Sequence, residues 1–134
     1  MIVNIKNNSF ELKWGLQAIN ELDKQFQFNL DYGELQSKFG AGLTFGIQVL
    51  NTDNVMVIAK FIKAGLKHIK GRQFTDDDIE AYLIDRVEQD GDLSTLVREL
   101  QEDLKSAPLT RNAMKDVEVE VAKENKNNKT PKKK

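Results

Sequence analysis

The chain has 134 residues, a formal net charge of −1 and no cysteine. This length accommodates a single domain, and its 40% apolar residues allow that domain a hydrophobic core. The absence of cysteine excludes thiol catalysis and thiolate metal sites, and no apolar run approaches the roughly 20 residues that span a bilayer.

The first 26 residues combine a strand pattern with a helix pattern. Polar and apolar residues alternate in Ile2–Lys6 and again in Phe10–Trp14, on either side of Asn7–Ser9. Because asparagine tolerates positive φ, this pattern predicts a short β-hairpin. Apolar residues at steps of three and four then predict a helix from Gly15 to about Phe26.

A second helix is predicted from Glu34 to Leu50 by the same spacing. It contains Gly40, Gly42 and Gly46, each of which costs a helix about 1 kcal/mol relative to alanine. We therefore expect these glycines either to allow close helix contact or to divide the helix. Phe45 projects from the polar side of this helix, where the sequence gives it no local partner.

A third helix, from Asp53 to Ile69, has an unusually wide apolar surface. Its lysines fall in one narrow arc, and apolar residues occupy most of the remaining circumference. This apolar arc is about twice the ~100° stripe that a surface helix needs to pack once. We therefore expect this helix to contact apolar surfaces on two sides.

Two further helices follow. Thr75 is expected to cap a helix that ends near Asp90, with acidic residues in its first turn. The predicted buried face of this helix consists of Ile79, Tyr82, Leu83 and Val87. Another helix is expected over Asp92–Ser106, before Pro108. Thr110–Glu124 has only weak helical character.

The charge is unevenly distributed along the chain. Residues 125–134 contain five lysines and no acid, whereas residues 1–124 hold 15 basic and 21 acidic side chains. We predict a mainly α fold, with about five helices and a short N-terminal β-hairpin in one compact domain over residues 1–107. Residues 108–134 are expected to form a weakly structured to disordered, lysine-rich tail.

No constellation of residues predicts catalysis. His68 is the only histidine and has no convergent partners in the sequence, so we expect it to pack. The glycines of residues 40–46 fit neither phosphate-binding motif, and the acids of residues 76–78 are better explained as helix capping than as metal ligands. We therefore predict a non-enzymatic protein without a cofactor, a metal site or a membrane segment.

Several segments, in this order, resemble a known family over about residues 1–106. They are Phe10–Leu16 at the end of the hairpin, Ile19–Lys24, the glycine-rich Phe39–Leu43, Leu66–Arg72, and Thr75–Glu80. Together they are similar to the tail assembly chaperones of long-tailed, siphovirus-type phages that infect Gram-positive bacteria. The resemblance implies a protein that binds the long, largely helical tape-measure protein and keeps it soluble until the tail tube polymerises. It also implies action in the cytoplasm of the infected host cell and absence from the mature virion.

The surplus apolar surface indicates where a partner would bind. We predict a partner-binding surface that includes Phe45, Met56, Val57, Phe61 and Ala64, used for the tape-measure protein or for homo-oligomerisation. The alternative is a small nucleic-acid-binding regulatory protein of a phage or bacterium, supported by the lysines of the third helix and the tail. Nucleic acid is the less expected partner, because the acidic body of the chain repels phosphate.

Overall fold

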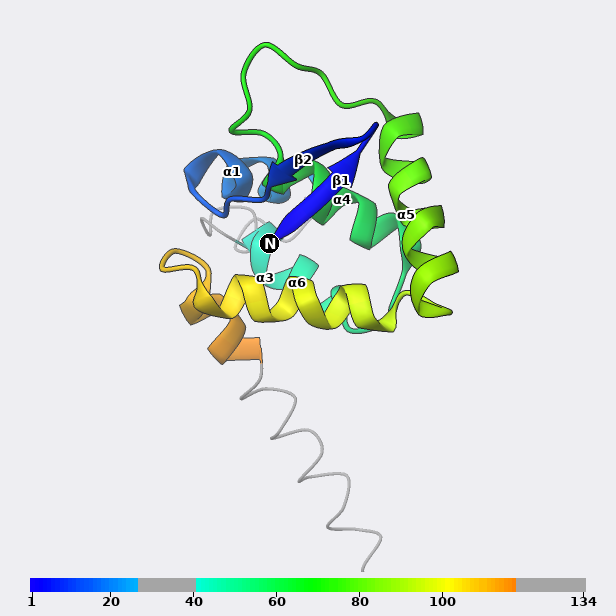
Figure 1. Ribbon diagram of the computed structural model, residues 1–134. Helices are drawn as coiled ribbons and strands as arrows, with labels where there is room; N and C mark the ends of the chain where they lie inside the picture. The colour runs from blue at the N-terminus through cyan, green and yellow to red at the C-terminus, as the bar shows by residue number, and fades with distance from the viewer. Residues whose placement is uncertain (27–40, 118–134) are drawn as a thin grey trace, which may run out of the picture.

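The computed structural model describes residues 1–26 and 41–117. Within them the elements are β1 (Ile2–Ile5), β2 (Asn8–Glu11), α1 (Leu16–Gln25), α3 (Ala41–Leu50), α4 (Val55–Gly65), α5 (Asp76–Asp90) and α6 (Ser94–Ser106), and residues 111–117 are also helical. The predicted mainly α fold with an N-terminal hairpin is confirmed (Figure 1). The predicted helical residues 34–40 and the predicted tail beyond residue 117 lie outside the described residues.

The two strands pair antiparallel, with Ile5 opposite Asn8. The turn was predicted at Asn7–Ser9, which is slightly too far along the chain. It is formed by Lys6 and Asn7, with φ of 52° and 66°. Two successive positive φ angles give a tight turn whose twist matches that of the strands. This register directs Val3 and Ile5 into the core and leaves the alternate residues exposed.

Glycines bring α1 and α3 into close contact, as one of the two sequence-based alternatives proposed. A Cβ atom at Gly42 would lie 2.5 Å from the Cα atom of Asp23, and one at Gly46 would lie 2.8 Å from the ring of Phe26. The Leu43 amide also donates a hydrogen bond to the Asp23 carboxylate, at 3.1 Å. The backbone of one helix thus lies directly against the other.

Helix α4 is the central element of the fold. It packs against α1, α3 and α5, as its wide apolar arc predicted. Phe61 is fully buried between the rings of Trp14 and Phe26, at centroid distances of 6.2 and 5.7 Å. The helix ends at Gly65 rather than at Ile69. The Gly65 carbonyl accepts a hydrogen bond from the amide of Lys13, in the segment after β2, at 3.0 Å, instead of from the next turn of a longer helix.

The N-terminal segment is also attached to α6. Asp103 accepts hydrogen bonds from the Trp14 indole at 2.7 Å and from the Met1 amino group at 3.0 Å. These bonds connect residues about 90 positions apart or more in sequence. Figure 1 shows the hairpin above α6, with the N-terminus at the end of β1 that is nearer to α6.

The core continues beyond residue 107, where the sequence-based boundary lies. Met114 and Val117 are buried in it, and the buried Thr110 hydroxyl donates to the Leu104 carbonyl at 2.6 Å. Residues 108–117 therefore pack on α6 as part of the same folded unit. Met114 and Val117 lie on the buried side of a short helix, which the weak periodicity of this segment barely indicated.

Candidate partner-binding surface

Three of the five predicted partner-binding residues lie inside the fold. Val57, Phe61 and Ala64 belong to the buried side of α4. The prediction was based on the wide apolar arc of this helix, and the neighbouring helices α1, α3 and α5 cover that arc. Their contact with a partner stays a prediction, and it would require the folded domain to open.

The other two predicted residues are accessible to different degrees. Phe45 is half-buried, and its ring packs edge-on against Phe26 with a centroid distance of 6.1 Å. The sequence shows no local partner for Phe45 because Phe26, at the C-terminal end of α1, is 19 residues away in the chain. Met56 is 64% exposed in the first turn of α4, where its amide donates to the Asn54 side chain that caps the helix, at 2.9 Å. Of the predicted residues, Met56 offers the most surface to a partner.

Sequence reasoning missed three further exposed apolar residues on α4 and α5. Val55 precedes Met56 in α4, and Ile84 and Val87 lie on α5. Val87 was expected on the buried face of its helix, but 37% of its surface is exposed. The neighbouring Arg86 occupies the inward position instead.

Arg86 is held inward by partners on two helices. It donates to both carboxylate oxygens of Glu99 on α6, at 3.0 and 3.1 Å, to Asp90 at 2.9 Å and to the Tyr82 hydroxyl at 3.1 Å. Burial opposes the charge on Arg86, but the hydrogen bonds that it donates to Glu99, Tyr82 and Asp90 raise its pKa above the ordinary arginine value. Burial likewise raises the pKa of Tyr82, with Arg86 acting in the opposite direction. These partners give Arg86 a structural role that joins α5 to α6.

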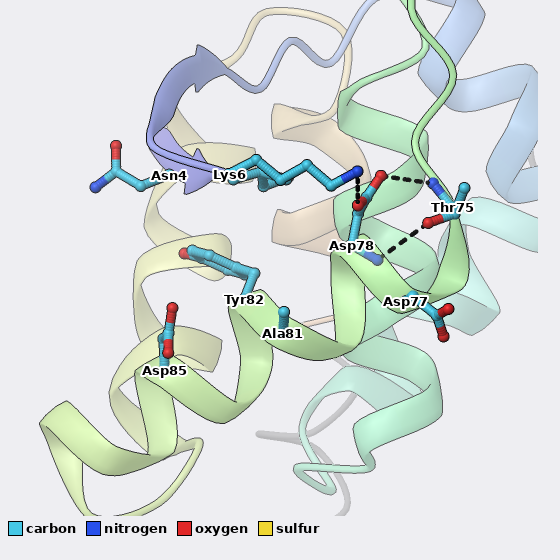
Figure 2. A pocket seen from close by; sticks show the side chains of 9 residues that line it. Asn4, Lys6, Thr75, Asp77, Asp78, Ala81, Tyr82 and Asp85 are labelled. Carbon is cyan, nitrogen blue, oxygen red and sulfur yellow. Dashed lines mark hydrogen bonds and ion pairs between the residues drawn. The ribbon is translucent and has the colours of Figure 1, made fainter.

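A small pocket lies between the hairpin and α5 (Figure 2). Its volume is 310 Å³, and it is lined by Asn4, Ile5, Lys6, Thr75, Asp77, Asp78, Ala81, Tyr82 and Asp85. At one end of it Lys6 reaches across from the hairpin turn to Asp78, with 2.9 Å between the amino nitrogen and a carboxylate oxygen.

The Asp78 side chain also completes the predicted helix cap. Its carboxylate accepts from the Thr75 amide at 3.0 Å, and its own amide donates to the Thr75 hydroxyl at 3.2 Å. The Lys6 ammonium and the Thr75 amide together hold the pKa of Asp78 below its ordinary value. The charged groups at this end of the pocket therefore stabilise the start of α5 and attach the hairpin to it.

The single histidine of the chain also has a structural role. The His68 ring nitrogen Nε2 lies 2.7 Å from the Glu11 carbonyl oxygen and thereby connects the turn after α4 to β2. In residues 1–26 and 41–117, no group of three or more histidine and acidic side chains is placed to hold a metal ion. None of the helices described there is long and apolar enough to cross a membrane.

A family model places the chain among known proteins. The model of the phage tail assembly chaperone protein, TAC, matches residues 2–118. The chain belongs to the phage tail assembly chaperones. This membership confirms the resemblance found in the sequence, and the match ends beside the last residue of the described core, Val117. No curated protein and no solved structure matches the chain.

Membership in this chaperone family supports a role in phage tail assembly through binding of a tail protein. It favours this role over the nucleic-acid-binding alternative. The family model covers residues 2–118 and does not identify individual partner-binding residues. Which residues bind the partner depends on the exposed surface of the fold.

Proposed function

We propose that the protein binds the tape-measure protein of its phage and keeps it soluble until the tail tube polymerises around it, without catalysing a reaction. The observation that carries this proposal is the match of the chaperone family model to residues 2–118. A tape-measure protein is long and largely helical, so before assembly its apolar helix faces lack a partner. A chaperone for such a protein needs a stable fold that also exposes an apolar surface to which these helix faces can bind.

The described surface has this property. The core is filled by residues from every described helix, from β1 and from the segment that follows β2. Large apolar side chains such as Met56 and Ile84 nevertheless remain more than half exposed. Clustered exposed apolar residues on a folded domain are typical of protein-binding sites. We further propose that the protein acts in the cytoplasm of the infected host cell and is absent from the mature virion.

Co-expression tests the proposed function. The tape-measure protein of the same phage is produced alone, with this chain, or with a Phe61→Asp variant that places a charge in the core and removes the folded surface. We expect the tape-measure protein to be insoluble alone, soluble with the wild-type chain and co-purified with it. Equal solubility in all three cultures, or solubility without co-purification, would contradict the proposal.

A further inference from the structure

Four large apolar side chains are exposed on α4 and α5, and we refer to them as the α4–α5 patch. Val55 and Met56, in the first turn of α4, are 49% and 64% exposed. Ile84 and Val87 on α5 are 51% and 37% exposed. Because the two α5 residues are three positions apart, they lie on one face of that helix.

The packing of α4 on α5 brings the two halves of the patch together. The Lys63 ammonium in the last turn of α4 lies 2.6 Å from the Asp76 carboxylate in the first turn of α5. The two helices are in contact, and α4 runs back from this bridge so that it begins beside the middle of α5 (Figure 1). Met56 is about 10 Å along α4 from Lys63, and Ile84 is about 12 Å along α5 from Asp76.

The border of the patch on α5 carries negative charge. The acids of this helix are Asp76, Asp77, Asp78, Glu80, Asp85, Glu88 and Asp90. Its single base, Arg86, is paired with Asp90 and Glu99. Glu80 and Glu88 are exposed and stand four residues before and after Ile84, so they flank it on the same face.

Part of this negative charge is not explained by the stability of α5. The acids at its start oppose the helix dipole, and Asp90 pairs with Arg86, but Glu88 stands at the end of the helix that disfavours negative charge. Glu80, Asp85 and Glu88 also have no lysine or arginine one turn away in this helix. A row of exposed acids beside exposed apolar side chains is explained if a cationic partner neutralises them.

We propose that the α4–α5 patch binds a helical segment that is apolar on one face and rich in lysine or arginine along the edges of that face. This proposal rests on the proposed function and specifies the chemistry of the tape-measure segment that is recognised. The apolar face would cover Met56 and Ile84, and the basic edges would lie against Glu80 and Glu88. Complementary charge at the border sets the orientation and speeds association.

Two other occupants fit the patch less well. Residues 125–134 of the chain carry five lysines but no apolar residue that could cover Met56 or Ile84. A second copy that met the first through the same patch would place Glu80 and Glu88 of both copies against each other, because a two-fold interface is self-complementary. A separate basic, amphipathic helix meets both requirements.

Two synthetic helical peptides about 18 residues long test this chemistry. One has leucine along one face and lysine on both edges, and the other has glutamate in place of every lysine. We expect the full chain to bind the lysine peptide, more weakly as salt screens the charges, and to bind the glutamate peptide at least about tenfold more weakly. The double variants Met56→Ser/Ile84→Ser and Glu80→Lys/Glu88→Lys should each weaken binding of the lysine peptide about tenfold or more.

Matched controls separate the patch from general charge and general apolar surface. Leu16→Ser/Leu109→Ser changes two exposed apolar residues outside the patch, and Glu102→Lys/Asp116→Lys reverses two exposed acids on other helical segments. Both control variants should bind the lysine peptide within about twofold of the wild-type chain. All variants change exposed side chains, so their melting temperatures should show that they remain folded.

Equal binding of the two peptides, or equal loss in the patch and control variants, would overturn the proposal. The same variants are then co-expressed with the tape-measure protein. If the wild-type chain retains the tape-measure protein and the patch variants retain it equally well, the patch proposal fails and the proposed function stands. If the wild-type chain does not retain it, the proposed function fails. Loss of retention only in the patch variants supports both.

Discussion

The contact between α1 and α3 depends on the absence of a side chain at Gly42. A glycine inside a helix normally costs about 1 kcal/mol relative to alanine, so helix propensity alone predicts that Gly42→Ala stabilises the protein. The structure predicts the opposite sign. The new Cβ atom would lie 2.5 Å from Cα and 2.9 Å from the carbonyl oxygen of Asp23, and backbone atoms cannot rotate away as a flexible side chain can.

The expected magnitude follows from two opposing contributions. Forcing extra volume into a packed contact costs about 1–3 kcal/mol and sometimes more. The hydrogen bond from the Leu43 amide to Asp23 holds the two helices in register and resists their separation. Because the clash is with backbone atoms at 2.5 Å, its cost belongs in the upper part of this range, about 2–3 kcal/mol. Subtracting the gain of about 1 kcal/mol in propensity leaves an expected net loss of about 1–2 kcal/mol. For a domain of this size that loss lowers the melting temperature by about 4–8 °C.

Thermal unfolding followed by circular dichroism measures this effect. Gln48→Ala is the matched control, because Gln48 is exposed in the same helix and alanine there changes propensity without a clash. We expect the control to melt within about 2 °C of the wild-type protein or slightly above it. A melting temperature for Gly42→Ala at or above that of the control would refute the close contact between the helices.

Three further predictions concern the bonds that join the elements. Thr75→Ala removes the hydroxyl half of the α5 cap and should cost about 1 kcal/mol in urea unfolding; no change would show that the cap is unimportant. Because the pKa of folded Asp78 is lowered by Lys6, the charged form contributes stability above the ordinary value of 3.8 and loses it as the pH falls through the lower folded value. Asp78→Asn should therefore be less stable than the wild type at neutral pH, with a difference that shrinks below pH 3.8; a constant difference would exclude the titration. Trp14→Phe removes the indole donor to Asp103 and should cost at least about 1–3 kcal/mol by chemical unfolding, because it leaves a carboxylate oxygen without that partner; an unchanged midpoint would exclude the contribution.

Local sequence signals predicted much of the fold. The capping box of Thr75 and Asp78 and the burial of α4 on two sides follow from residues close together in the chain. The hairpin register could not be predicted from local signals, because it depends on the positive φ of Lys6. Lysine is not a residue type that indicates a turn with positive φ. The end of α4 at Gly65 depends on a hydrogen bond from a segment that is distant in sequence.

The candidate surface was harder to predict for the same physical reason. Phe61 has the periodicity of a surplus apolar face, but the packing of three other helices covers it. Val87 has the periodicity of a core residue, but Arg86 turns inward because Glu99 on α6 supplies its partner. Ile84 and Met56 of the proposed patch come from different helices, and only the packing of α4 on α5 can bring them to one surface. A pattern within one helix does not reveal which of its faces other elements will cover.

Hydrogen exchange of the chain, alone and in complex with the tape-measure protein, tests the account most directly. If the folded chaperone binds through its surface, the added protection should concentrate at the first turn of α4 and over residues 80–88 of α5. The amides around the buried Phe61 should keep the slow exchange that they have in the free chain. Protection confined to other elements would contradict the proposed surface. Faster exchange around Phe61 in the complex would show that the partner binds an opened chain through the core residues of α4.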